Sequence, residues 1–467
     1  MFYYSVNNNR TSNLISMKNR FILHLALILS ISVAFSQEHF SGITTSSRGG
    51  LLNGYYNPAE LSNMNMKFDV NLFNTSINFS NNKLTFNDLL DSENLENKFF
   101  SGTEAANVRL DALILGPGVA FKNGNWTYAV STLANIKANI INVDTQLGDA
   151  IQNGSLSNFI SQTTISSIDN QRINAATWGE IDLSISRKLI DIARHQINAG
   201  ATIKLLFPSA YANFSASNLQ GTIRNNLGDI ELANASAQIN LAYSGFLGND
   251  FNNTSNYANF FKQGINGVAF DIGGTYRFKE ANSNKYIVSA GLAVKNIGGM
   301  SYKDDSNTSI DYNLNVGNFP TLDLNQFESA SSLSEIEEIL SQPQNAQFFQ
   351  KTKTSASFKV KLPTTINAYA DFKLTSKFYA TATINQKVTD DSESDVTTTQ
   401  NTYSIIPRFV YRQLEIFAPQ ASNEISGFTS GLGFKIYGFY IGSSSIVTAA
   451  LNNSKQADIY LGLRFGI

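Results

Sequence analysis

Cysteine is missing from the whole 467-residue sequence, and histidine occurs only three times. Without cysteine the chain forms no disulfide bond and no thiolate metal site. Hydrolytic chemistry usually depends on a histidine that acts as general base. His24 and His39 fall near the N-terminus and His195 falls in an expected turn, none with an expected serine or aspartate partner. We therefore predict no enzyme, no catalytic residue and no cofactor.

A strong charge of one sign is also missing. The chain has 34 Lys and Arg against 36 Asp and Glu, a net charge of −2, which argues against a nucleic-acid partner. No stretch after residue 36 holds 18 consecutive apolar residues, so the sequence predicts no helix that spans a membrane. A β-barrel would escape a search for apolar runs, because only alternate residues of its strands face lipid.

The last eleven residues, 457–467, show such a pattern. Odd positions are apolar, and even positions are polar or small. Alternation with period two indicates a strand with one apolar face, and in an exported chain it is typical of the closing strand of an outer-membrane β-barrel. This strand is the part we expect the barrel-assembly machinery to recognise. Expected to face lipid are Ile459, Leu461 and Leu463; expected to face the lumen are Asp458, Tyr460 and Arg464.

Export is indicated near the N-terminus. A basic start at Met17 to Arg20 precedes an apolar stretch from Phe21 to Phe35, and Ala34 and Ser36 are small residues before a cut at Gln37. We predict a cleavable signal peptide over residues 17–36, with residues 1–16 upstream of the true start. The mature chain would then comprise a plug-like segment, 37–65, and a transmembrane barrel, 66–467, in the outer membrane.

Alternating segments recur along this barrel region and predict an all-β antiparallel barrel of about 14–16 strands, with short helices in outer loops. A soluble β-sandwich also alternates, but usually with shorter strands. The inward positions carry charges of both signs in near-equal number, which favours pairing across the lumen over a selective ion pore. These positions are Lys137, Asp182, Asp271, Arg277, Lys295, Asp371, Lys373, Arg408, Asp458 and Arg464.

Short and long connections alternate, as expected for periplasmic turns and outer loops. Asn225 to Gly228 is one short link that we place on the periplasmic side. In the long connection 303–355, Ser332 and Glu335 form a capping box that predicts a helix. The acidic run 390–395 has carboxylates enough for Ca²⁺, but the spacing matches no calcium loop, so we predict a solvated face and no metal.

The segment before the first strand carries a family resemblance. Gly54-Tyr55-Tyr56-Asn57-Pro58-Ala59-Glu60-Leu61 resembles the NPA-x-L element of long-chain fatty-acid transporters (FadL) and PorV-like barrels. Residues 289–298 resemble the strand end of the same superfamily, with Gly291, Asn296 and Gly298 at its fixed positions. The chain departs from the usual barrel ending, because its last aromatic residue, Phe465, lies two positions before Ile467. The Asn-rich, cysteine-free composition resembles that of uncharacterised Bacteroidota outer-membrane proteins.

This resemblance leaves two functions open. Similarity to the fatty-acid transporter implies a plugged barrel that passes a hydrophobic small molecule. Similarity to PorV implies a non-transporting partner barrel that anchors or shuttles secreted proteins. A transporter should have an apolar pocket and a gap or kink in one strand wall, whereas a partner barrel should have a sealed lumen and apolar side chains exposed on its loops.

Overall fold

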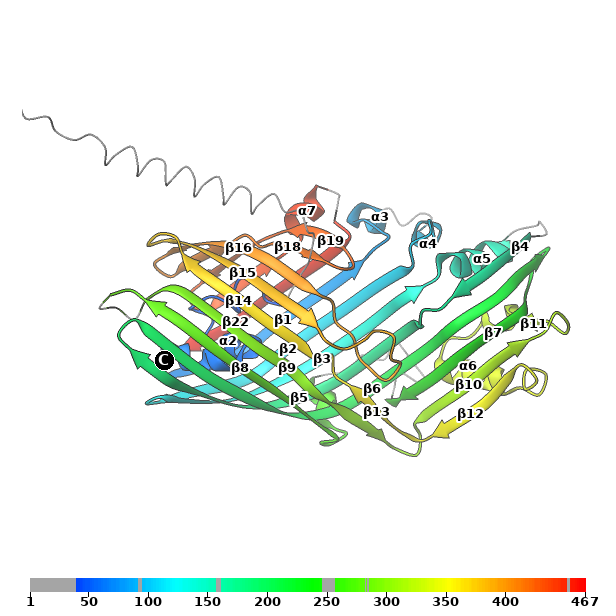
Figure 1. Ribbon diagram of the computed structural model, residues 1–467, viewed down its shortest axis with the longest axis horizontal. Coiled ribbons are helices and arrows are strands. Elements are labelled where there is room, and N and C mark those ends of the chain that lie inside the picture. Colours follow the sequence, from blue (N-terminus) through cyan, green and yellow to red (C-terminus); the bar gives the residue numbers. More distant parts are fainter. Residues whose placement is uncertain are drawn as a thin grey trace, which may run out of the picture. The chain divides into compact units, whose positions relative to one another are not determined.

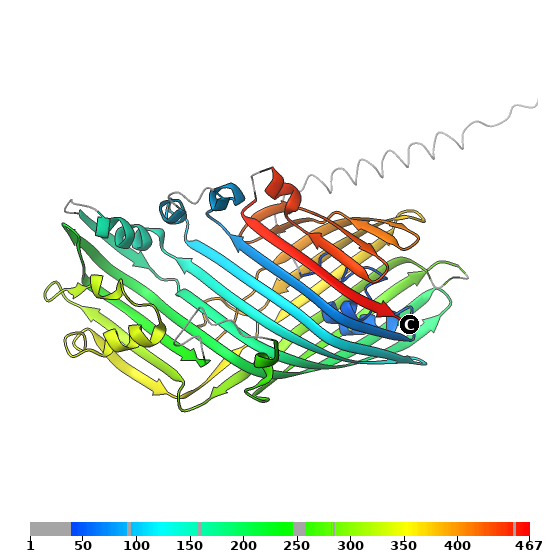
Figure 2. The same ribbon diagram turned by 180° about the vertical axis from the view of Figure 1, so that it is seen from behind.

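The last strand of the chain closes the sheet on the first. In the computed structural model, β22 (Gln456–Gly466) pairs antiparallel with β1 (Phe68–Asn81) (Figure 2). The structure describes residues 39–90, 95–156, 161–245, 257–281, 283, 285–451 and 454–467. The signal peptide expected over 17–36 lies outside these residues and stays a prediction.

Within the described residues, the sheet closes as a 14-strand antiparallel barrel with additional strands (Figure 1). The predicted all-β barrel is thus confirmed, at the lower end of the expected strand number. Two of the 14 strand positions are each occupied by a pair of short strands, β17 with β18 and β19 with β20. Between β1 and β22 the barrel contains β2 (Ala106–Asn123), β3 (Trp126–Val143), β5 (Gln171–Ile192), β6 (His195–Asn226), β8 (Gly267–Lys279), β9 (Tyr286–Lys303), β14 (Thr365–Lys373), β15 (Phe378–Lys387), β16 (Thr402–Tyr411), β17 (Leu414–Phe417), β18 (Gln420–Asn423), β19 (Gly427–Ser430), β20 (Leu432–Ile436) and β21 (Phe439–Ser443).

Side chains alternate between the two faces of these strands. Apolar side chains such as Val130, Leu183 and Ile459 are exposed on the outer face, and polar side chains are buried inside. The alternation follows from the strand pleat, and an apolar outside with a polar inside is the pattern of a transmembrane barrel. Among the described residues, no helix has the length and apolar character that crossing a membrane requires.

Strand β6 carries the sheet beyond the closed barrel. Its first part pairs with β8, and its last part, from Tyr211 onward, pairs instead with β7 (Asp229–Ser244). This extension of the sheet, which we call the outer lobe, continues from β7 to β10 and from β10 to β12 (Figure 1). The elements of the lobe and its surroundings are β4 (Ser161–Ser167), β10 (Thr308–Val316), β11 (Leu322–Asp323), β12 (Phe349–Ser355), β13 (Ser357–Lys361), η4 (Asn325–Phe327), α5 (Thr145–Leu156) and α6 (Leu333–Ser341).

The outer lobe has a hydrophobic core of its own. Leu241, Ile310 and Tyr312 from its strands are buried together with Leu333 and Leu340 of α6. The helix begins at the predicted capping box, where the Ser332 hydroxyl accepts a hydrogen bond from the backbone N–H of Glu335 at 3.2 Å. The Asn225–Gly228 turn lies in this lobe, where it joins β6 to β7, so our assignment of it to the periplasmic side was wrong.

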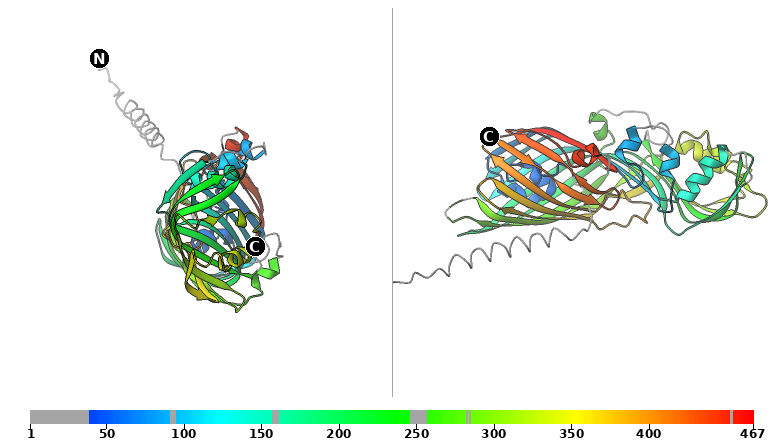
Figure 3. Two further views of the ribbon diagram at one scale, coloured as in Figure 1. Left: turned by 90° about the vertical axis from the view of Figure 1, so that its right-hand side faces the viewer. Right: turned by 90° about the horizontal axis from the view of Figure 1, so that it is seen from above.

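The N-terminal segment, residues 39–65, lies inside the barrel. It forms α2 (Leu51–Tyr56) and η1 (Pro58–Asn63), and most of its side chains are buried. In Figure 3 the darkest blue helices, α2 and η1, are enclosed by the strands. Three further short helices lie in connections between strands: α3 (Phe86–Leu90), α4 (Leu95–Phe99) and α7 (Ile446–Ala450). A fourth, η3 (Tyr257–Phe261), packs on the outer face of β5 and β6.

Candidate functional site

The NPA-like motif rests on three glycines of the barrel wall. Asn57 donates from Nδ2 to the carbonyls of Gly274 at 3.1 Å and Leu292 at 3.3 Å, and its Oδ1 accepts the backbone N–H of Ala59 at 3.0 Å. A Cβ added at Gly273 would lie 2.1 Å from Asn57 Oδ1, and one at Gly200 would lie 2.5 Å from the Ala59 backbone nitrogen. The motif therefore reaches the wall only because Gly200 and Gly273 carry no side chain.

Neighbouring side chains of the motif extend this contact. Tyr56 donates its hydroxyl to the Ala368 carbonyl at 3.0 Å, and its ring lies edge-on to that of Tyr369 at 5.9 Å. The Lys295 ammonium lies 3.9 Å from the centroid of the Tyr55 ring. Leu61 is buried with Leu51 and Met64, and Pro58 packs on Gly200. Gly291 lies against the side chains of both Tyr369 and Asn57, which leave no room for a Cβ at this position.

Two of the strand-end residues form a bulge. Asn296 has a φ of 60° and Gly298 a φ of 150°, and the register between β8 and β9 shifts at this point. The backbone N–H of Asn296 donates to Asp271 Oδ1 at 2.6 Å, while its own Oδ1 accepts from Lys204 Nζ at 2.7 Å. The left-handed conformation suits asparagine and glycine, so the motif marks a bend in the wall.

Most of the lumen charges meet a partner of opposite sign. Lys204 lies between Glu180 at 3.4 Å and Asp271 at 3.3 Å. Arg277 binds Glu60 of the N-terminal segment at 3.1 Å. Other ion pairs join Asp371 with Arg408, Arg408 with Glu415, and Arg464 with Asp69. Asp182 lines a small cavity together with Tyr55 and Asp271.

Two of the predicted lumen residues lie apart from this network. Lys373 pairs with Glu280 at the short-turn end of the barrel. Asp458 lies near the opposite end, where it accepts hydrogen bonds from the Ser443 hydroxyl at 3.2 Å and the Ser444 N–H at 2.8 Å.

Several charged residues of the lumen were not singled out in the sequence. Lys204 and Glu180 occupy inward positions of the period-two pattern, so extending the alternation along β5 and β6 would have found both. Glu60 lies within the NPA-like element itself. Its partner Arg277 comes from β8, and no local pattern connects the two.

His39 differs from the expectation that it has no partner. Its Nδ1 lies 2.8 Å from the Ser76 hydroxyl, and its Nε2 lies 3.2 Å from Asp111 Oδ1. Although hydrolytic sites use the same residue types, Ser76 is only 2% exposed, and a nucleophile must meet its substrate. We interpret the group as an anchor for the start of the N-terminal segment.

The other side of the lumen is apolar. Phe40 packs edge-on against Tyr440 at 6.2 Å and Tyr460 at 6.0 Å, and the Tyr460 hydroxyl donates to the Ser41 carbonyl at 2.6 Å. We call this group the apolar lumen cluster. Its members are Phe40, Ile43, Leu52, Leu113, Leu115, Leu133, Ile406, Phe417, Tyr440 and Tyr460.

The barrel wall is interrupted beside this cluster. At Gly116 and Pro117, β2 is unpaired from β1, and its register with β3 shifts by one residue. Proline has no N–H to give to a neighbouring strand. The Gly116 carbonyl accepts instead from Asn71 Nδ2 at 2.8 Å, and the Pro117 carbonyl accepts from the Thr132 hydroxyl at 3.0 Å. Side chains thus replace strand pairing at this point.

The interruption is covered from the outside by η3. The Tyr257 hydroxyl donates to Thr132 Oγ1 at 3.1 Å, and a Cβ at Gly116 would lie 2.2 Å from that same hydroxyl. Phe261 packs against Phe207 with ring centroids 5.3 Å apart. The interruption of β2 is therefore covered by η3 on the outer face and by α2 of the N-terminal segment on the inner face.

The acidic loop, residues 388–401, folds across the outer mouth. Arg172 donates to the Val396 carbonyl at 3.1 Å, and Asn170 donates to the Ser392 carbonyl at 2.7 Å. Asp391 accepts from Lys387 Nζ at 2.6 Å. The predicted solvated face is confirmed for Asp390, Glu393 and Asp395, which are exposed, whereas Asp391 is half-buried. The loop that carries them nevertheless contacts β5 and β6 across the barrel.

The carboxylates of this loop are engaged by cations. Burial raises the pKa of Asp391, but Lys387 and Arg109 more than offset it, so that the pKa lies below its usual value. Asp395 lies 3.6 Å from Lys361. In the described part of the chain, no three His, Cys, Asp or Glu side chains come together in a group that could hold a metal ion.

Comparison with solved structures shows similarity to outer-membrane channels. A deletion mutant of the TodX monoaromatic hydrocarbon channel has a TM-score of 0.44 at 12% identity, covering 90% of this chain and 95% of that one. The Ralstonia pickettii toluene transporter TbuX has a TM-score of 0.40 at 9% identity, covering 92% and 99%. A Pseudomonas aeruginosa FadL homologue has a TM-score of 0.42 at 9% identity, covering 93% and 100%. Scores this low carry no argument about cargo.

No curated protein sequence matches the chain. A family model, described as a family of unknown function (DUF5723), matches residues 58–444, from the proline of the NPA-like motif to the end of the β21 region. Because this match covers most of the chain, the protein belongs to the DUF5723 family.

Proposed function

We propose that this protein is a gated outer-membrane barrel that passes a hydrophobic small molecule. The observation that carries the proposal is the interruption of β2 at Gly116 and Pro117 beside the apolar lumen cluster. An outward apolar belt supports the membrane location. The comparisons give no support to the partner-barrel alternative.

The apolar side of the lumen suits a hydrophobic cargo better than the charged side. The ion pairs around Lys204 and Arg408 would expose an apolar molecule to buried charge. The apolar lumen cluster offers surfaces such as Leu52, Leu115 and Leu133, along which a hydrophobic molecule keeps contact with apolar side chains. We therefore assign the route to the side of the lumen that faces β1, β2 and β3.

Passage requires the N-terminal segment to move. The cavity between this segment and Leu115 and Leu133 has a volume of about 20 Å³, whereas small-molecule sites measure roughly 300–1,000 Å³. The segment is held by hydrogen bonds, among them Ser62 to Ser186 at 2.7 Å. Release of such contacts would open the apolar side without unfolding any strand of the barrel.

A disulfide lock tests this function. The chain has no cysteine, so Ser62→Cys with Ser186→Cys creates one defined pair whose side-chain atoms already lie within disulfide reach. In cells that display the protein, we expect the oxidised double variant to take up the fluorescent hydrophobic probe N-phenylnaphthylamine at the background rate. A reductant should restore uptake.

The two single cysteine variants are the matched controls, and both should transport in either redox state. Barrel assembly is checked by the shift in gel mobility on heating. Equal uptake by the oxidised, the reduced and an empty-vector strain would remove the transport proposal. Equal uptake by oxidised and reduced protein, both above background, would remove the movement of the segment.

We also propose that residues 17–36 are removed on export and that residues 457–467 are recognised by the barrel-assembly machinery. The basic and apolar pattern after Met17 supports the first, and the alternation of the closing strand supports the second. N-terminal sequencing of the protein from outer-membrane fractions should begin at Gln37. An intact Met17 in that fraction would contradict cleavage.

A further inference from the structure

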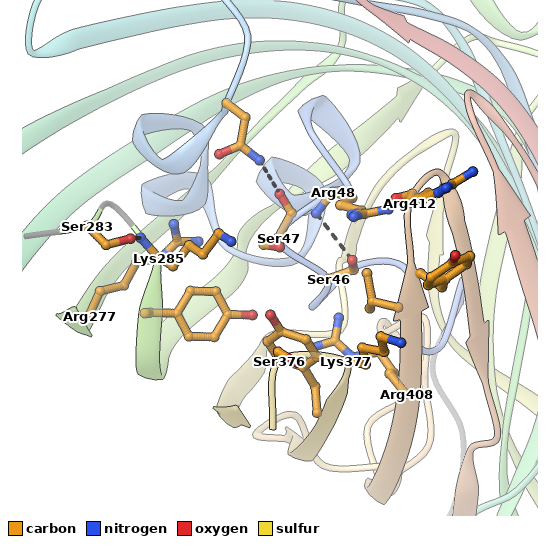
Figure 4. Close-up of a pocket in the computed structure, with 15 residues that line it drawn as sticks. Ser46, Ser47, Arg48, Arg277, Ser283, Lys285, Ser376, Lys377, Arg408 and Arg412 are labelled. Atoms are coloured by element: carbon orange, nitrogen blue, oxygen red, sulfur yellow. Dashed lines mark hydrogen bonds between the residues drawn. The ribbon is translucent and has the colours of Figure 1, made fainter. Parts of the chain in front are cut away.

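A cavity of about 640 Å³ lies at the end of the barrel that carries the short turns. Figure 4 shows it between the start of the N-terminal segment and the turns after β8, β14 and β16. The proposed transport route does not use it. Its side chains are cationic, serine or tyrosine for the most part, and none of the described residues that line it is a carboxylate.

Two of the six cations around this cavity are neutralised inside the lumen. Arg277 pairs with Glu60 at 3.1 Å, and Arg408 pairs with Asp371 and Glu415. The charge of these two arginines is therefore balanced by carboxylates inside the lumen.

The other four cations have no carboxylate within ion-pair distance among the described residues. They are Arg48, Lys285, Lys377 and Arg412. Arg48 donates from Nη1 to the Arg412 carbonyl at 2.6 Å, which brings the N-terminal segment to the β16 turn. The Lys377 ammonium and the Arg412 guanidinium lie 4.9 Å and 5.4 Å from the centroid of the Tyr411 ring. Four like charges thus share one hollow.

A concave site lined by charge of one sign concentrates ions of the opposite sign. Its volume lies in the range of small-molecule sites, roughly 300–1,000 Å³. Guanidinium and ammonium groups bind phosphate and carboxylate oxygens through charge-assisted hydrogen bonds, and the rings of Tyr286, Tyr379 and Tyr411 offer surface for the organic part of a ligand.

We propose that this cavity binds a small organic anion that carries two or more phosphate or carboxylate groups, on the periplasmic side of the barrel. The convergence of the cations into a hollow favours a small ligand over the flat surface of an acidic protein. Arg48 belongs to the N-terminal segment, so the bound anion would also hold that segment in place.

Isothermal titration of the purified full chain in detergent tests the site. The probes are inorganic pyrophosphate and citrate at low ionic strength, where surface electrostatics are least screened. We expect saturable binding that weakens as salt is added. Each cation removed, as in Lys285→Gln or Lys377→Gln, should weaken binding about tenfold, the usual worth of one charge-assisted hydrogen bond.

Lys67→Gln is the matched control. Lys67 precedes β1 at the same end of the barrel and lies over the Phe121 ring at 5.9 Å, outside the cavity. Its loss should leave binding unchanged. Preference for pyrophosphate or for citrate would identify phosphate or carboxylate as the group recognised, and either supports the site. No saturable binding of either probe, or an equal loss in Lys67→Gln, would overturn it.

Discussion

Arg464 on the last strand forms an ion pair with Asp69 on the first strand, across the seam that closes the barrel. The same guanidinium donates to the carbonyl of Arg48, so it joins β22, β1 and the N-terminal segment. Asp69 is 2% exposed, and a buried carboxylate without its cation is costly.

The first prediction follows from this pair. Arg464→Gln should lower the free energy of unfolding by about 3–5 kcal/mol, because it leaves the Asp69 carboxylate buried and uncompensated. Asp69→Asn added to Arg464→Gln should recover most of that loss. Urea titration followed by the gel-mobility shift measures both; a double variant as unstable as Arg464→Gln would show that the ion pair does not carry the effect.

The second prediction concerns the lipid face of the closing strand. Leu461→Arg should cost about 2–4 kcal/mol if the position lies near the bilayer midplane, because a charge would face hydrocarbon. Leu461→Phe, which keeps that face apolar, is the control. The fraction of folded protein in outer-membrane preparations measures the effect, and wild-type assembly of the arginine variant would contradict the lipid-facing assignment.

The third prediction concerns two adjacent glycines of β8. Gly273→Ala should displace the N-terminal segment and raise ion conductance in planar bilayers, since its Cβ would lie 2.1 Å from Asn57 Oδ1. Gly274→Ala should conduct like the wild type, because its Cβ would meet only the Asn198 carbonyl at 3.7 Å. Equal conductance of the two variants would argue against a segment that blocks the lumen.

The fourth prediction is a pH dependence of the loop 388–401. The pKa of Asp391 is lower in the folded loop than in an open one, because Lys387 and Arg109 outweigh the effect of burial. The ionised carboxylate therefore stabilises the closed loop above the unfolded pKa, about 3.9, and this stabilisation is lost as the pH falls through the folded value. Conductance should rise below about pH 4.

Asp391→Asn should conduct more already at neutral pH and lose most of that acid response. Asp390→Asn is its control, because the Asp390 carboxylate is exposed and accepts hydrogen bonds from the nearby Ser392 instead of from a cation of the barrel. An unchanged acid response in Asp391→Asn would assign the opening to another group.

The barrel itself was predictable because its rule is local. One residue in two faces lipid, so strands such as residues 126–140 and the closing strand could be read directly. The helix at Ser332 was predictable for the same reason, since a capping box is complete within four residues.

The outer lobe and the loop 388–401 were not predictable in this way. An alternating strand looks the same whether its neighbour is β8 or β7, so nothing local shows that β6 exchanges partners near Tyr211. The contacts of the loop across the mouth could not be predicted because its partners, Arg109, Asn170 and Arg172, lie more than 200 positions away in the chain. The pairing of Glu60 with Arg277 was not predicted for the same reason, because the two residues lie far apart in the chain.

The length of β6 has a consequence for how the cell surface is encountered. Its 32 residues extend over about 100 Å at roughly 3.3 Å per residue, whereas the apolar band of an outer-membrane barrel is only about 25 Å tall. Even when tilted, much of this strand would stand above the bilayer among the sugar chains of the outer leaflet. In the outer-membrane location that we propose, an antibody or a phage that approaches the cell would therefore touch the β7–β10–β12 strands before it could reach the mouth of the barrel.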